Sequence, residues 1–184
     1  MSLPAVTFRP CTPDDLPLVA GWLLQPHVAR WWPDDPSLAA VEARYTPCLD
    51  GRDPTELFVL EADGAPAGFF QRYLVADHPD WAATLRGTGQ PGVENAVGID
   101  YLIGTAELTG RGLGTIAISA FTRLALVRYE AASLMAVAVS QGNIASWRAL
   151  EKAGYRRCWA GELDSDDPSD EGPMYLCCRD RGDT

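Results

Sequence analysis

The pattern of apolar and polar positions in the first third of the chain predicts a strand followed by two helices. Val6 to Arg9 is typical of a short strand. Thr12 then predicts a helix start, because Thr is a good N-cap and Pro13 fits the first helical position. The apolar stripe of this helix comprises Leu16, Val19, Ala20, Leu23 and Leu24. Ser37 predicts the cap of a second helix, whose apolar positions are Leu38, Val41 and Tyr45.

A hairpin is predicted next, because Leu57 to Glu61 and Ala67 to Tyr73 are strand-like and flank an Asp63-Gly64 turn. The following stretch, Val75 to Asn95, is rich in Gly, Pro and Asp, and its composition predicts a long loop. Long loops in compact domains commonly line a functional site.

The second half of the chain alternates between strands and helices. Apolar residues from Leu113 to Val127 predict a helix, and the apolar run Leu134 to Val139 predicts a strand buried on both faces. A further helix is expected from Asn143 to Ala153, because Gly154 is a good C-terminal stop. Two last strands are expected at 155–159 and 174–178, joined by an acidic loop at 162–171. The order predicts a single mixed α/β domain over residues 1–184.

Composition and charge narrow the possible functions. The formal net charge is −10, from 25 acidic and 15 basic residues, which disfavours nucleic acid as a partner and suits a polycationic one. No apolar run approaches the roughly 18–20 residues of a membrane span, and the first residues do not resemble a secretory signal. The five cysteines lack metal-ligand spacing, so we expect reduced thiols in a cytoplasmic protein without a metal.

The stretch from Val97 to Thr115 carries the main chemical signal. It predicts a short apolar strand and then a glycine-rich loop, with Gly110, Gly112 and Gly114 at alternate positions, that opens a helix. Backbone N–H groups at such a helix start bind phosphate groups. Asp100 is an acid within the apolar strand beside this loop. The loop lacks the Lys-Ser/Thr pair of a nucleotide triphosphatase, so a different phosphate-bearing ligand is favoured.

Three segments in this order carry a resemblance to a known family. They are Gly110 to Thr115, the pattern Asn143-x-x-Ser146, and Glu151 to Tyr155. Together they resemble the GCN5-related N-acetyltransferase superfamily, with Thr109 departing from the Gln or Arg that usually opens the glycine motif.

The resemblance implies a mixed sheet, flanked by helices and splayed where acetyl-CoA binds, with a core at about residues 97–160. It implies that the pyrophosphate lies on the backbone of Arg111, Gly112, Leu113, Gly114 and Thr115. The pantetheine arm is expected along Tyr101, Leu102 and Ile103, with Asn143 and Ser146 on its other side. Asp100 is then the catalytic candidate that accepts the proton of the attacking amine during direct transfer.

A narrower resemblance rests on residues 27–32, 68–73 and 98–100, which look like aminoglycoside 6′-N-acetyltransferases. This resemblance carries the following substrate-binding positions over to this chain: Trp32, Tyr45, Asp53, Gln71, Asp80, Trp81 and Glu171. Acids that face ammonium groups and aromatics that flank sugar rings suit a polycationic glycoside.

Two departures from the superfamily leave alternatives open. Leu150 stands where a Tyr usually protonates the departing thiolate, and Ala138 stands where relatives carry an acid. The acceptor could therefore be another amine, such as a lysine-derived siderophore precursor or a protein or peptide amine. A non-catalytic acyl-CoA-binding module is the alternative from a different class. Both a monomer and a homodimer are compatible with the sequence.

Overall fold

The computed structural model describes residues 4–183, which form two compact units. The first unit comprises Met1–Arg72 and Asp100–Leu113, and the second comprises Tyr73–Ile99 and Gly114–Thr184. The strands follow the sheet order β1-β2-β3-β4-β5-β7-β6. Their bounds are β1 Val6–Pro10, β2 Glu56–Ala62, β3 Ala65–Leu74, β4 Val97–Ile103, β5 Leu134–Ser140, β6 Arg156–Glu162 and β7 Pro173–Asp180.

The sheet is mixed, as the sequence predicts. β4 runs parallel to β5, with Val97 opposite Met135 and Gly98 opposite Ala136. The pairs β1–β2, β2–β3, β5–β7 and β6–β7 are antiparallel. The mixed α/β fold class is therefore confirmed. The splaying of β4 away from β5 stays a prediction.

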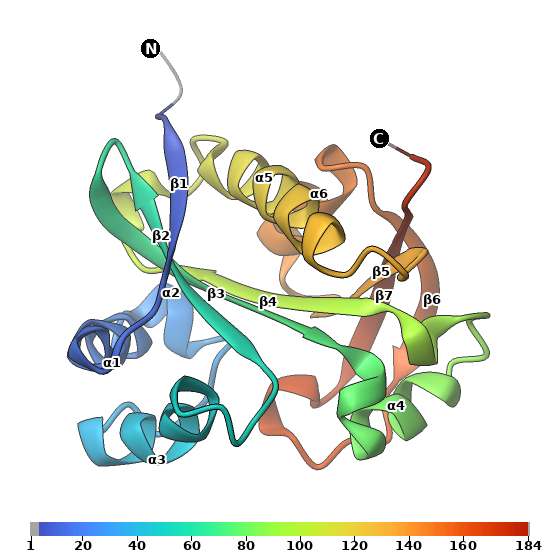
Figure 1. The fold of residues 1–184 in the computed structure, drawn as a ribbon. Helices are drawn as coiled ribbons and strands as arrows, with labels where there is room; N and C mark the ends of the chain where they lie inside the picture. Colours follow the sequence, from blue (N-terminus) through green and yellow to red (C-terminus); the bar gives the residue numbers. More distant parts are fainter. Residues whose placement is uncertain (1–3, 184) are drawn as a thin grey trace. The chain divides into compact units, whose positions relative to one another are not determined.

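Two helical segments of the first unit begin at the predicted caps, whereas the short helix at Pro26–Ala29 was not predicted. Thr12 forms a capping box with Asp15 before the 3₁₀ turn Pro13–Asp15 and α1 (Leu16–Leu23), and α2 (Pro26–Ala29) follows. The Arg9 guanidinium donates to the Asp15 carboxylate at 2.7 Å and holds the pKa of that group at about 2. Ser37 caps α3 (Leu38–Leu49) by accepting the N–H of Ala40. In Figure 1, α1 and α3 appear at the lower left.

The hairpin of the first unit has the predicted two-residue turn. Asp63 and Gly64 both have positive φ values, 51° and 80°, which is the conformation that matches the twist of paired strands. The register then places Ala62 opposite Ala65 and Glu56 opposite Arg72. Strands and helices of this unit share one apolar core, which includes Leu16, Val19, Leu23, Val41, Tyr45, Val59, Phe69 and Leu102.

The second unit corrects one prediction. The stretch from Val75 to Asn95 is not a plain loop, because it contains α4 (Pro79–Arg86) between the 3₁₀ turns Val75–Asp77 and Val93–Asn95. Pro79 occupies the first helical turn, where its missing N–H costs nothing. Ala82 and Leu85 are buried in the apolar core of this unit. Burial of these few apolar side chains outweighs the loop-like composition.

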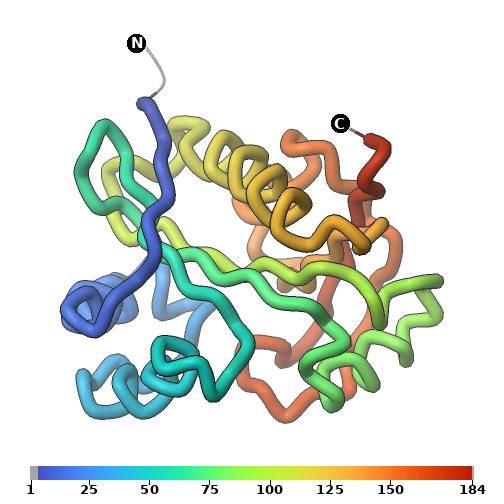
Figure 2. The backbone as a smooth tube through the Cα atoms, viewed as in Figure 1, coloured from blue at the N-terminus to red at the C-terminus, as the bar shows by residue number. Residues whose placement is uncertain are grey.

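Two arginines of the last strand region hold the ends of the other helices, α5 (Leu113–Arg128) and α6 (Ile144–Lys152). The Arg181 guanidinium donates to the carbonyl oxygens of Leu126 and Tyr129, at 3.0 and 2.6 Å, at the C-terminal end of α5, the yellow helix in Figure 2. Arg179 donates to the carbonyl oxygen of Ala153, just after α6, at 2.7 Å. These carbonyls lack intrahelical partners, and a cation is favourable at this end of a helix.

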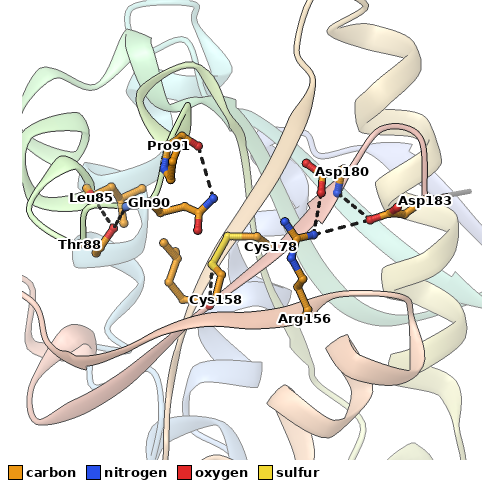
Figure 3. The surroundings of a disulfide bond; sticks show 10 residues. Leu85, Thr88, Gln90, Pro91, Arg156, Cys158, Cys178, Asp180 and Asp183 are labelled. Carbon is orange, nitrogen blue, oxygen red and sulfur yellow. Dashed lines mark hydrogen bonds and ion pairs between the residues drawn. A yellow bond between two sulfur atoms is a disulfide. The ribbon is translucent and has the colours of Figure 1, made fainter.

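The cysteines depart from the expectation of reduced thiols. Cys158 and Cys178 form a disulfide between β6 and β7, 20 residues apart in sequence (Figure 3). Cys158 lies at the register shift of β6, between Arg157 and Trp159, so the bulge brings it to Cys178. Sequence spacing does not reveal this pairing, because the bulge sets it. Cys11, Cys48 and Cys177 are free thiols.

We predict that removal of this disulfide destabilises the chain. Cys158→Ser, or reduction of the wild type, is expected to lower the free energy of unfolding by about 2–4 kcal/mol, because the unfolded chain regains the entropy of the closed loop. Urea titrations with and without reductant measure this change. Cys48→Ser serves as the control and is expected to keep the response to reductant. Five titratable thiols in the oxidised wild type would contradict the pairing.

Candidate functional site

The acid that the sequence singles out, Asp100, lies within β4 after three buried residues, 97–99, and is itself half-buried. The next residue, Tyr101, stacks on the ring of Phe70 at 5.4 Å between ring centroids. Beyond it, Gly104 donates its N–H to the carbonyl oxygen of Ala67 at 2.8 Å, which ties the end of β4 to β3. The carboxylate is therefore carried by a strand whose following residues are firmly held.

Tyr45 of α3 is a buried residue of the first unit whose pKa is influenced by the charge of Asp100. Its side chain is 1% exposed, and its ring packs edge-on against Phe69 with centroids 5.1 Å apart. Burial raises the pKa of Tyr45, and the negative charges of Asp34 and Asp100 raise it further, whereas the nearby Arg44 lowers it. Both acids therefore act on the same phenol group. The hydroxyl of Tyr45 has no hydrogen-bond partner in residues 4–183.

Three further predicted acceptor residues belong to the first unit. Trp32 is half-buried and packs against the apolar core that contains Tyr45. Gln71 lies on β3 and is 8% exposed, which is unusual for an amide side chain. Asp53 accepts the N–H of Thr55 at 2.8 Å, so its carboxylate helps to form the turn before β2.

The remaining predicted acceptor residues belong to the second unit. Asp80 is exposed in the first turn of α4, and the half-buried Trp81 packs against the core of that unit. Glu171 is exposed, whereas burial raises the pKa of its neighbour Asp170, whose carboxylate accepts the Ser165 hydroxyl at 2.7 Å. Thr84 of α4 donates to the carbonyl oxygen of Asp164, so α4 and this acidic loop are joined.

The end of β4, where the resemblance places the pantetheine arm at Tyr101, Leu102 and Ile103, depends on a glycine and a histidine. A Cβ at Gly68 would lie 2.4 Å from the carbonyl oxygen of Leu102, so only glycine fits there. The His27 Nε2 atom lies 2.9 Å from the carbonyl oxygen of Ile103, at donor distance. No local sequence pattern pairs His27 with this strand, because His27 and Ile103 lie 76 residues apart.

The glycine-rich loop has the conformation that its sequence predicts. Gly110 and Gly112 have φ values of 71° and 87°, in the left-handed region that glycine adopts without strain. Arg111 and Gly112 are exposed, and α5 begins at the next residue, Leu113. Gly114 and Thr115 lie in the first turn of α5. The unpaired N–H groups of this turn and the positive end of the helix suit an anionic ligand.

Asn143 and Ser146 meet at the start of α6. The Asn143 side-chain oxygen accepts the N–H of Ser146 at 3.2 Å, so this pair caps the helix. Leu150, four residues after Ser146, is fully buried in the second unit and offers no proton donor. Ala138 lies on β5 opposite Leu176 and likewise contributes no polar group.

The described residues contain neither a cluster of metal-ligating side chains nor a membrane-spanning helix. In residues 4–183, no group of three or more His, Cys, Asp or Glu side chains is placed to hold a metal ion. None of the helices formed by this part of the chain is long and apolar enough to span a bilayer.

A mixed sheet, a strand-borne acid and a glycine loop before a helix define an N-acetyltransferase of the GCN5-related class.

Comparison with a family model supports this class. The model described as an acetyltransferase (GNAT) domain matches residues 12–163, which include both Asp100 and the glycine loop. The chain belongs to this acetyltransferase family, whose members use acetyl-CoA as the acetyl donor.

Individual relatives share a narrower activity. The aminoglycoside N(6′)-acetyltransferases type 1 of Klebsiella pneumoniae and Serratia marcescens are each 30% identical over 158 residues, covering 83% of this chain and 75% of theirs. A solved structure of aminoglycoside acetyltransferase AAC(6′)-Ib with coenzyme A has a TM-score of 0.81 and 27% identity, covering 97% of this chain and 96% of that one.

Sequence reasoning missed two charged residues near Tyr45. Asp34 and Arg44 form an ion pair at 2.5 Å in the first unit, and both line a cavity beside Tyr45. The sequence places Asp34 among turn residues after the Trp31-Trp32 pair, where a solvated acid is expected. The sequence signal that could have pointed to this cavity is the acidic pair Asp34-Asp35, which closely follows Trp31 and Trp32.

We predict that Tyr45→Phe stabilises the fold. A buried hydroxyl without a partner costs free energy, so its removal is expected to raise the free energy of unfolding by about 1 kcal/mol. Chemical denaturation measures the change. A control variant, Tyr155→Phe, removes a hydroxyl that is hydrogen-bonded to Thr122 at 2.7 Å, and we expect it to destabilise the protein. A loss of stability in Tyr45→Phe would show that its hydroxyl is satisfied.

Proposed function

We propose that this chain acetylates the 6′-amine of aminoglycosides, with acetyl-CoA as the donor. The observation that carries the proposal is the 30% identity, over 83% of the chain, to two aminoglycoside N(6′)-acetyltransferases. The strand-borne Asp100 and the glycine loop supply the two parts that this chemistry requires. The product of the reaction has lost one positive charge, which weakens binding to RNA phosphates and accounts for antibiotic resistance.

The residues of the glycine loop fit the proposed donor. The backbone N–H groups from Arg111 to Thr115 stand at the positive end of α5 and suit the pyrophosphate of acetyl-CoA. The strand residues Tyr101, Leu102 and Ile103 are proposed to pair with its amide-containing arm. When bound, acetyl-CoA supplies an activated acetyl thioester. Asn143 and Ser146 remain predicted contacts to the same ligand.

Asp100 is proposed to handle the proton of the amine. An amine attacks a thioester only through its lone pair, so the ammonium group must first lose a proton to a nearby base. A half-buried carboxylate can attract the ammonium group and accept that proton, directly or through a water molecule. The new N–C bond forms as the C–S bond breaks, the nitrogen then releases its surplus proton to solvent, and the thiolate takes up a proton. Since Leu150 cannot donate one, solvent is the proposed source.

The first unit also offers groups suited to the acceptor. Trp32 is proposed to face a sugar ring, and Gln71 to donate or accept hydrogen bonds from β3, whereas the buried Tyr45 remains a predicted contact. The net charge of −10 favours the approach of a polycation. Asp53, Asp80, Trp81 and Glu171 remain predicted contacts. We place the reaction in the cytoplasm, where both acetyl-CoA and the ribosomal target of these drugs are found.

We predict that turnover requires an amine at the 6′ position. Kanamycin and ribostamycin carry this amine, whereas paromomycin carries a hydroxyl group there. Release of the CoA thiol is expected with the first two and only at background level with paromomycin. L-Lysine and a lysine-containing peptide test the alternative acceptors in the same assay. If paromomycin is turned over as fast as kanamycin, the acetylated group is an amine other than the 6′-amine. If only lysine is turned over, the proposal is wrong.

We predict that Asp100→Asn lowers kcat for kanamycin by about 10²–10⁴-fold, because an amide cannot accept the proton. The KM for acetyl-CoA is expected to stay within about threefold, since the substitution preserves the shape of the strand residue. Asp50→Asn is the matched control, because Asp50 is an exposed acid paired with Arg52. A kcat near that of the wild type would remove Asp100 from the mechanism.

A further inference from the structure

A cavity of about 450 Å³ opens in the first unit beside the buried Tyr45. Asp34 and Asp35 line it from the loop before α3, and Arg44 and Tyr45 line it from α3 itself. Leu23, the last residue of α1, adds an apolar wall. Two carboxylates at one cavity disfavour an anionic ligand and favour a cationic one.

The phenol of Tyr45 is an independent sign of a ligand. Its side chain is 1% exposed and forms part of the cavity wall, yet its hydroxyl has no hydrogen-bond partner among residues 4–183. Buried hydroxyl groups are nearly always paired, so an unpaired one on a residue of the cavity wall calls for an explanation.

The cavity already binds one cation, which belongs to the chain itself. The Arg44 guanidinium contacts a carboxylate oxygen of Asp34 at 2.5 Å, and its central carbon lies 5.8 Å from the centre of the Tyr45 ring. A carboxylate and an aromatic face together are what an ammonium group needs. The Arg44 side chain is 46% exposed, so it can swing into solvent. An ion pair this exposed contributes little to stability, and its exchange for another cation costs little.

We propose that this cavity is a subsite for a second ammonium group of the acceptor, which replaces Arg44 as the partner of Asp34. The inference rests on the proposed function, because it assumes an acceptor with several amines on linked rings. Tyr45 lines the cavity, and the charges of Asp34 and the proposed catalytic acid Asp100 both act on its phenol. The subsite would therefore hold one amine while Asp100 receives another.

A metal ion does not explain the cavity equally well. In the described part of the chain no three acidic, His or Cys side chains converge, as a metal site of this kind requires. One oxygen of Asp35 is also engaged, because it accepts the N–H of Ser37 at 2.9 Å. The carboxylates therefore suit an ammonium group, which needs only one or two charged contacts.

Substitutions of Asp34 and Arg44 are expected to change the Kd for kanamycin in opposite directions. Kanamycin binding is measured by titration calorimetry on the full chain, without acetyl-CoA and at low ionic strength. Asp34→Asn removes the anion and is expected to raise the Kd about tenfold. Arg44→Gln removes the competing cation and is expected to lower the Kd about two- to fivefold. Asp50→Asn, which disrupts an exposed Asp–Arg pair outside the cavity, is expected to leave the Kd within about twofold.

Three results would overturn the inference. If Asp34→Asn and Arg44→Gln weaken binding alike, the ion pair is only structural, and if neither changes the Kd, or the wild type does not bind kanamycin, the cavity is not a subsite. Thermal unfolding of each variant confirms that it is folded. Failure of the proposed function is separate, because opposite shifts in Kd support the subsite even if no aminoglycoside is acetylated. Conversely, if the wild type acetylates kanamycin but Asp34→Asn and Arg44→Gln leave its Kd unchanged, the subsite is ruled out while the proposed function stands.

Discussion

The close approach of β3 to the end of β4 is the constraint on which the candidate site depends. A Cβ at Gly68 would lie 2.4 Å from the carbonyl oxygen of Leu102, and one at Gly104 would lie 2.1 Å from the Trp22 ring. The two glycines let backbone and indole pack where any side chain would force the strand away. The strand that carries Asp100 is thereby held in place, and its position determines what the carboxylate can reach.

The electrostatics of the first unit centre on a single buried aromatic side chain. The charges of Asp34, Asp100 and Arg44 shift the pKa of the Tyr45 hydroxyl, while the ring of Tyr45 packs against Phe69 in the core. One residue thus connects core packing with the proposed acceptor site. The unpaired hydroxyl is a cost to stability, and such costs are typical of residues kept for binding.

A side chain that follows β7 closes the C-terminal end of α5. Arg181 satisfies carbonyls at that end of the helix, while the glycine loop precedes its N-terminal end. The disulfide between Cys158 and Cys178 joins the last two strands, and Cys178 belongs to the core that includes Ala82 and Leu85 of α4. Only the N-terminal end of α5 is proposed to bind a ligand, the pyrophosphate of acetyl-CoA.

Local signals were sufficient for the elements and for part of the site. Thr12, Ser37 and the Asp63-Gly64 turn predicted their caps and hairpin because each acts within a few residues of its own position. The glycine loop and Asp100 are proposed as site residues from local signals of the same kind. Tertiary structure alone decided the helix within residues 75–95, the Cys158–Cys178 pairing at a bulge, and the meeting of Asp34 with Arg44 beside Tyr45. Each of these depends on burial or contact between separate elements, which no local pattern encodes.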